Sequence, residues 1–573
     1  MAGRRDRERN TNAWCLTDQT GCHAPVNPRP LCTIRGPEFV LLPLRLPRLL
    51  LVLIACATCL FAGPTAHSDA GDGEKPAANA QDLQECYAKL LKHTDFSSFS
   101  ERMRAVRQMG TLDCPQARQH LMRIATTAKS LDDRIVAITS LGERMGVAEA
   151  KLVAETVRRK RNPLLTQALA QAFILATNKH TLTWLATDAF GIRDPSVLQA
   201  VVDAQTIHAD PRARPRLHAV FVQHRDKPRT MALAYASLRA IGTIADARDR
   251  SFLLRVPGFA EWRLRLAGAE TIARLKPVDI NVRGAIVEYL GDASPVVREA
   301  AITSTGRAGI VELTDNIADR LEDEHIRTRA VAHAALMEMH GKDLGWDPAD
   351  WKRWWKKRTD LPKDIQQHPS SSVTTYYGVK VHSDRILFII DLSGSMAFPW
   401  GAEVDKTRIG VAKRQLLKAI DCLEDSTLFN VIVFSDKVKS WRRKGEVKAN
   451  AEHKADARQW IEKTFEKPTG GTFMHAALET AFAENPQVDT IFLLTDGLAT
   501  DGEPIVPEAI LASVNRWNRF RRVVVHTFAL TLEDLSKGEL DKKSLADIKR
   551  FMHRLAGLTG GECRIVTTPP KAP

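Results

Sequence analysis

The fold is decided by the stretch Ile386-Leu387-Phe388-Ile389-Ile390-Asp391-Leu392-Ser393-Gly394-Ser395. Its first five residues are apolar, which predicts a strand of a parallel sheet, because a strand covered on both faces has no polar side. The loop that follows carries one carboxylate and two hydroxyls, and Gly394 lets the backbone bend so that Ser393 and Ser395 point at one place. Oxygen ligands on a short loop suit Mg²⁺. Ligands of open α/β sheets bind at the carboxyl ends of the strands.

Two later stretches strengthen this interpretation. Thr469-Gly470-Gly471-Thr472 is a glycine turn that opens a helical pattern, and Ile491-Phe492-Leu493-Leu494-Thr495-Asp496 is a second apolar strand that ends in an acid. With these stretches, residues 383–566 resemble the von Willebrand factor A domain with its metal-ion-dependent adhesion site. All five positions of that site match the family's motif.

The resemblance implies a role for each of the five residues. Ser393, Ser395 and Thr472 would offer hydroxyls to Mg²⁺, or to Mn²⁺, while Asp391 and Asp496 would act close behind, mostly through waters. Three neutral hydroxyls leave the cation underneutralised, so a partner's Asp or Glu would complete the octahedron. The implied function is therefore metal-dependent binding of a protein.

Helices and strands are predicted to alternate throughout residues 383–568. Such alternation gives an α/β domain with a mostly parallel, doubly wound (Rossmann-like) sheet and helices on both faces. Helices are expected at 408–423, 455–465, 507–520 and 545–558, and strands at 428–434, 437–441, 523–529 and 562–566. The three metal loops then converge at one edge of the sheet.

Residues 96–345 are predicted to form an α-solenoid, in which short amphipathic helices alternate with a turn that contains Asp or Asn. The turn recurs roughly every 31 residues, a period typical of stacked helix pairs. Asp292-x-x-Pro-Val-Val-Arg298-x-Ala-Ala resembles the HEAT repeat, and Asp323-x-x-Ile-Arg327-x-Arg-Ala repeats the theme. The resemblance implies that the Asp caps a helix and the Arg reaches back toward the turn. Stacking leaves a long concave surface that suits a second, large protein partner.

A tryptophan-rich segment, residues 346–365, joins the two parts. Trp351, Trp354 and Trp355 fall on one face of a predicted helix, with basic residues between them. Such a helix could stack on single-stranded nucleic acid or lie in a membrane interface. We favour a helix that caps the last repeat, because aromatics at helical spacing usually face a core. Residues 366–382 are expected to form a linker.

The N-terminal segment, residues 1–69, is interpreted as a leader, and residues 70–95 are interpreted as a linker. Residues 49–63 carry no charge and have the length of the apolar part of a signal peptide, with an uncleaved membrane anchor as the alternative. We therefore expect an exported protein, periplasmic or at the cell surface. Cys86 and Cys114 could then form a disulfide, or both could be buried thiols.

Enzymatic activity is not expected. No Gly-x-x-x-x-Gly-Lys-Ser/Thr phosphate loop is present, and His475 is the only base near the metal motif in the sequence. The net charge of +14 does not select a partner class by itself. The favoured function is an exported, metal-dependent adhesion or scaffold protein. One alternative is an RNA-binding protein, since helical repeats before an A domain resemble the Ro ribonucleoprotein architecture; another is an adaptor for a separate ATPase.

Overall fold

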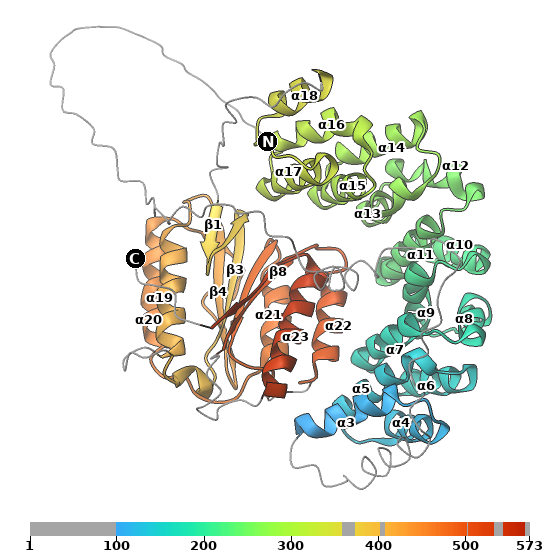
Figure 1. The fold of residues 1–573 in the computed structure, drawn as a ribbon, viewed down its shortest axis with the longest axis horizontal. Helices are drawn as coiled ribbons and strands as arrows, with labels where there is room; N and C mark the ends of the chain where they lie inside the picture. The colour runs from blue at the N-terminus through green and yellow to red at the C-terminus, as the bar shows by residue number, and fades with distance from the viewer. Residues whose placement is uncertain are drawn as a thin grey trace, which may run out of the picture.

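The computed structural model describes residues 99–357, 373–400, 407–500, 502, 504–531 and 542–567. The leader at 1–69, its apolar stretch at 49–63, the linker at 70–95 and Cys86 therefore lie outside the described residues. The described chain forms an arc of helices and an α/β domain, and the α/β domain is seated on the concave side of the arc (Figure 1). Among the described residues, no helix is long and apolar enough to cross a membrane.

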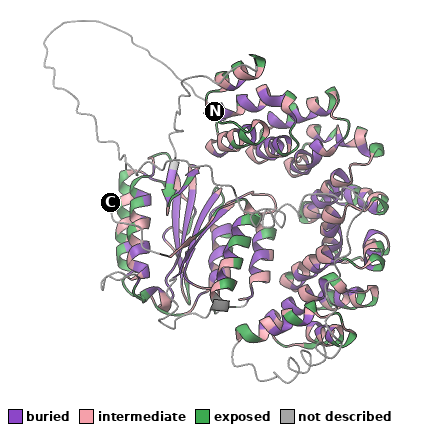
Figure 2. Ribbon diagram, viewed as in Figure 1, coloured by how far each residue is buried: buried purple, intermediate pink, exposed green. Residues whose placement is uncertain are grey.

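The arc is a double row of helices, as the repeat period predicts. The inner helices pack each on the next; they are α3 (Phe99–Thr111), α5 (Leu131–Leu141), α7 (Pro163–Leu175), α9 (Pro195–His208), α11 (Met231–Ile244), α13 (Trp262–Thr271), α15 (Pro295–Arg307) and α17 (Ile326–His340). The outer helices are α4 (Pro115–Thr127), α6 (Val147–Lys160), α8 (Lys179–Ala186), α10 (Arg214–His224), α12 (Arg250–Leu253), α14 (Ile280–Leu290) and α16 (Thr314–Ala318). The core lies between the two rows (Figure 2).

Polar side chains close the turns between these helices. Asn162 and Asp194 accept hydrogen bonds from the first backbone N–H groups of α7 and α9, and each is followed by a proline at the first helical position. Asp132 lies inside the first turn of α5, which begins after the N-cap Ser130. Cys114 is a free cysteine, and its sulfur accepts from the N–H of Ala117 at the start of α4.

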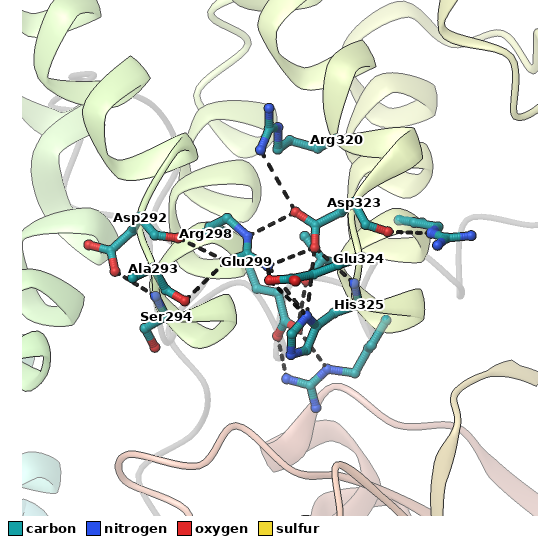
Figure 3. Close-up of polar contacts among 12 residues, drawn as sticks. Asp292, Ala293, Ser294, Arg298, Glu299, Arg320, Asp323, Glu324 and His325 are labelled. Carbon is teal, nitrogen blue, oxygen red and sulfur yellow. Dashed lines mark hydrogen bonds and ion pairs between the residues drawn. The ribbon is translucent and has the colours of Figure 1, made fainter. Parts of the chain in front are cut away.

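The HEAT-like turns are linked from one repeat to the next. Arg298 donates to the backbone oxygen of Asp292, six residues back, and also to the carboxylate of Asp323 in the following turn, at 2.7 Å (Figure 3). Arg265 bonds Asp292 in the same way, at 2.6 Å. Buried carboxylates of this ladder are thus paired with arginines of the preceding repeat.

The second HEAT-like motif contains two arginines, Arg327 and Arg329, and only one of them reaches back toward the turn. The arginine that reaches back to the Asp323 carbonyl is Arg329, at the six-residue spacing that Arg298 also has. Arg327 points to the other side of its helix, toward Glu299 and the α/β domain. Asp323 also does not cap α17 directly, because its carboxylate accepts from the N–H of His325, the residue before the helix.

The arc ends in α18 (Pro348–Lys357), which packs against α16. The indole of Trp351 is fully buried and donates to the backbone oxygen of Gly345 at 2.8 Å. A buried indole cannot stack on a nucleotide base or enter a membrane interface. Residues 358–365 of the expected capping segment lie outside the described residues.

The α/β domain contains a seven-stranded sheet in the order β5-β4-β3-β7-β8-β9, with β6 also paired to β4. Strands β3, β4, β7, β8 and β9 are parallel, while β5 and β6 are antiparallel additions at one edge. The strands are β3 (Arg385–Asp391), β4 (Leu428–Phe434), β5 (Val438–Ser440), β6 (Val447–Lys448), β7 (Thr490–Thr495), β8 (Val524–Leu530) and β9 (Cys563–Val566). The predicted doubly wound fold is therefore confirmed.

Helices cover both faces of this sheet (Figure 1). One face is packed by α19 (Arg408–Asp421) and α20 (Ala451–Thr464), and the other by α21 (Met474–Glu484), α22 (Pro507–Trp517) and α23 (Lys542–Thr559). The end of the expected linker at 366–382 is instead a hairpin of β1 (Val373–Tyr376) and β2 (Val379–His382). It forms because Tyr376, Val379 and Val381 are buried on the core of the domain.

The two parts share a polar and aromatic interface. Near the start of the arc, Arg107 of α3 binds Glu508 of α22 through two bonds of 2.7 and 2.8 Å. In the middle, Arg519 binds Asp203 of α9 at 2.8 Å. Near the end of the arc, Arg327 donates to the backbone oxygen of Asp489 at 2.9 Å. The concave surface that was expected to bind a second partner is therefore covered, along these contacts, by the chain's own α/β domain.

Candidate metal centre

The centre lies where the chain order of the sheet reverses. Strand β3 continues through α19 to β4 on one side, and β7 continues through α22 to β8 on the other. β3 and β7 are parallel neighbours, with Ile390 opposite Leu494, so Asp391 and Asp496 leave the sheet at the same edge. Loops at such a switch point open away from each other and leave room for a ligand.

Asp391 is held rigidly at this edge. It is fully buried, its Oδ1 accepts from the N–H of Ser393 at 2.7 Å, and its Oδ2 accepts from Thr495 Oγ1 at 2.6 Å. The first bond turns the loop back over the end of β3, and the second ties the carboxylate to the end of β7. These two hydrogen bonds hold the motif in place through contacts within the protein alone.

Ser393, Ser395 and Asp496 form one continuous hydrogen-bonded chain. The two serine hydroxyl oxygens lie 3.2 Å apart, and Ser395 Oγ donates to Asp496 Oδ1 at 2.8 Å. Ser393 and Asp496 are both buried. The structure thus brings together four of the five residues named by the sequence motif through direct contacts.

The fifth residue, Thr472, lies on a turn that is bonded to the same loop. The N–H of Gly394 donates to the backbone oxygen of Gly470 at 3.0 Å, and the N–H of Thr469 donates to that of Leu392 at 3.0 Å. Gly470 has φ +85°, and a Cβ there would lie 2.9 Å from the carboxyl carbon of Asp436. Glycine is therefore required for the close approach. Thr472 itself is buried beside this contact.

One charged residue of the centre was missed by sequence reasoning. Arg408, at the start of α19, places its Nη1 2.8 Å from Asp496 Oδ2 and 3.3 Å from the backbone oxygen of Ser395. Both partners of the Arg408–Asp496 ion pair are nearly inaccessible to solvent. The only available signal was a basic residue at the start of the helix that follows the metal loop, and this pattern also describes many exposed helix ends.

The electrostatics of the site favour a bound cation. Burial, together with the nearby charge of Asp496, raises the pKa of Asp391 well above its ordinary value. Burial also raises the pKa of Asp496, although Arg408 opposes that shift. A divalent cation would relieve the cost of two buried carboxylates, and hydroxyl and carboxylate oxygens are the donors that Mg²⁺ and Mn²⁺ prefer. The residues present therefore fit such an ion.

His475, the histidine nearest to the metal motif in the sequence, makes its contacts on another helix. Within the described part of the chain, no group of three or more His, Cys, Asp and Glu side chains could hold a metal ion. His475 Nε2 lies 2.9 Å from Ser513 Oγ of α22, and its ring packs against Trp517. The histidine is thus engaged on α22, away from the serines of the metal loop.

A doubly wound sheet with these three loops at its switch point has the features of a von Willebrand factor type A domain. Residues 384–541 match the family model of that description, and this domain is preceded by the arc of stacked helix pairs. The chain is 29% identical over 148 residues to inter-alpha-trypsin inhibitor heavy chain H3 of Mesocricetus auratus. The matched region covers 24% of this chain and 16% of the relative. The chain thus spans only a small part of that relative's length.

Two solved structures share limited similarity with the chain. The von Willebrand factor type A protein from Catenulispora acidiphila is 22% identical, with a TM-score of 0.26, and the match covers 33% of this chain and 40% of that protein. The Ro (RSR) protein of Deinococcus radiodurans is 15% identical, covers 86% of this chain and 96% of that chain, and has a TM-score of 0.20.

Proposed function

We propose that this protein binds a partner protein through a divalent cation held by the A domain. The observation that carries the proposal is the cluster in which Ser393, Ser395 and Asp496 are hydrogen-bonded in series beside the buried Asp391. Ser393, Ser395 and Thr472 would supply hydroxyl oxygens to Mg²⁺ or Mn²⁺. Asp391 and Asp496 would hold the ion's waters.

The cation would supply a positive charge that the hydroxyl donors do not cancel. A carboxylate is the group that such an ion binds best from outside, so the partner would present Asp or Glu. Phe398 supports a protein partner, because it follows the metal loop and its side chain remains 44% exposed. An apolar side chain of this size beside a charged centre gives a partner a surface to pack against.

The arc would act as the frame that carries the A domain. Its concave side is covered by that domain, so a second protein partner would bind the outer helices. The proposal also includes export, with residues 49–63 as a signal peptide or anchor that places the metal centre in the periplasm or at the cell surface. No catalytic step is part of the proposal.

The test is a comparison of captured partners. The full chain, Asp391→Ala and the control Asp425→Ala would be immobilised and exposed to a cell-surface extract in Mg²⁺ or EDTA. Asp425 is an exposed carboxylate of the same domain that lies just before β4, at the opposite end of the strands. We expect the wild type and Asp425→Ala to retain a common protein in Mg²⁺ alone, and Asp391→Ala to lose it.

Two results would contradict the proposal. One is capture that EDTA and Asp391→Ala leave unchanged. The other is retention of RNA in place of protein, with affinity that falls steeply as salt rises, which is the behaviour of a phosphate-binding surface.

A further inference from the structure

Arg408 places a buried positive charge inside the proposed metal centre. Its side chain is 3% exposed, and its guanidinium donates to Asp496 Oδ2, while Asp496 Oδ1 already accepts from Ser395. Both oxygens of Asp496 are therefore engaged. A metal ion bound to the serine hydroxyls would therefore lie beside a carboxylate whose two oxygens already accept hydrogen bonds from Ser395 and Arg408.

The arginine is held in this position by its surroundings. Thr407 caps the start of α19 through its hydroxyl, which accepts from the N–H of Gly410 at 3.1 Å. The N–H of Arg408 donates to the backbone oxygen of Phe398 at 3.0 Å, and the guanidinium lies 5.6 Å from the centre of the Phe398 ring. The charge is thus fixed from the metal loop on one side and from the helix on the other.

The charge balance of the centre follows from these contacts. With Asp391 ionised, the two buried carboxylates of Asp391 and Asp496 carry −2 and Arg408 carries +1, so a divalent cation would leave +1 among these three buried groups and the ion. Without the arginine the same cation would be neutralised. A positive group close to the ion in a poorly solvated site opposes metal binding strongly, because Coulomb interactions are weakly screened there.

We propose that Arg408 sets the charge of this metal centre, so that the cation binds weakly alone and tightly only together with a carboxylate from outside. The inference rests on the proposed function and adds to it a reason for the acidic partner. The incoming carboxylate would cancel the remaining positive charge. By linkage, it would strengthen metal binding by the same factor by which the metal strengthens carboxylate binding.

The test is a titration of the full chain with Mn²⁺ alone, followed by electron paramagnetic resonance. It compares the wild type, Arg408→Gln, Arg408→Lys and Arg414→Gln, the last being an exposed arginine of the same helix. We expect Arg408→Gln to bind Mn²⁺ about tenfold tighter than the wild type, and the other two variants to stay within about threefold. Equal or weaker binding by a folded Arg408→Gln overturns the inference.

A second measurement needs only the wild type, in case Arg408→Gln does not fold. Sodium acetate, as a small carboxylate, is added at constant ionic strength in place of chloride. We expect the affinity for Mn²⁺ to rise at least about fivefold, and an unchanged affinity overturns the inference. If the wild type binds Mn²⁺ without either effect, only the inference fails. If none of the four proteins shows saturable binding, the proposed function fails with it.

Discussion

The ring of Phe520, in the A domain, meets the ring of Tyr235, in helix α11 of the arc, edge to face with 5.0 Å between their centres. Trp262 of α13 lies 6.4 Å from the same phenylalanine ring. Arg519 and Arg522 flank Phe520 and bind Asp203 and Glu270 of the arc. The turn between α22 and β8 is thus an aromatic anchor surrounded by ion pairs, which fixes the orientation of the metal centre relative to the arc.

Phe520→Ala should loosen this docking. The substitution removes an aromatic contact and partly buried apolar area, together worth about 2 kcal/mol. We expect a larger radius of gyration in solution scattering and separate calorimetric transitions for the two parts. Phe398→Ala, at the exposed phenylalanine near the metal loop, is the control and should change neither readout. Identical scattering of Phe520→Ala and the wild type would show that this turn does not hold the domain.

The ion pair between Arg519 and Asp203 should stabilise the docking of the A domain on the arc, and exchanging the two charged residues tests this. Both side chains are about four-fifths buried in the interface. Replacing one partner leaves the other charge poorly solvated, at a cost of about 2 kcal/mol. Arg519→Asp should therefore open the docked arrangement, and the double variant Arg519→Asp with Asp203→Arg should restore it. A double variant as open as the single one would argue against a direct pair.

Within the arc, Arg298→Ala should lower the free energy of unfolding by about 3 kcal/mol. Arg298 and Asp323 are 6% and 2% exposed, so the substitution strands a buried carboxylate. Arg320 is a matched control, because it lies 3.9 Å from the same carboxylate but is much more exposed. Urea unfolding of both variants gives the comparison. Equal effects of Arg298→Ala and Arg320→Ala would contradict the ladder.

His526 should make the domain sensitive to acid. Burial lowers the pKa of His526 to about 4, and its Nδ1 accepts from the N–H of Glu562 at 3.1 Å, so protonation would place two donors face to face. At pH values between 6.5, the ordinary pKa of histidine, and about 4, His526 is protonated in the unfolded chain but not in the folded chain. Folding stability therefore falls as pH falls through this window, by about 3 kcal/mol in total.

The check is thermal unfolding at pH 7 and pH 4.5. His526→Asn keeps an acceptor for the Glu562 N–H but cannot take up the proton, so its loss of Tm on acidification should be smaller than that of the wild type. His553→Asn, at an exposed histidine of α23, serves as the control. An equal loss of Tm in His526→Asn and the wild type would assign the acid sensitivity to other groups.

The elements that sequence analysis predicted are those with a local signal. The apolar runs before Asp391 and Asp496 mark buried strands, and a glycine turn marks the approach of Thr472, because each pattern reflects burial or backbone geometry at that residue. The repeat period likewise predicts the double row of helices. These signals were sufficient for the sheet, the arc and the grouping of the metal loops.

What could not be predicted are contacts between residues far apart in the chain. Nothing in the sequence indicates that Arg408 would turn toward Asp496, or that Phe520 would pack against Tyr235. Arg327 and Arg329 are two residues apart, and only their opposite directions from one helix decide that Arg329 closes a turn while Arg327 binds the A domain. The A domain covers the concave face through such contacts. Because they leave no signal in the sequence, the concave surface was predicted to be open to a second partner.

The most direct test of the metal centre is the position of a bound ion. Crystals of the full chain would be soaked in Mn²⁺ and measured for anomalous scattering at the manganese edge. We expect one strong peak within about 2.3 Å of the hydroxyl oxygens of Ser393, Ser395 and Thr472, with Asp391 and Asp496 one water further away. A peak at another place, or none at these hydroxyls when Mn²⁺ is in excess, would contradict the account.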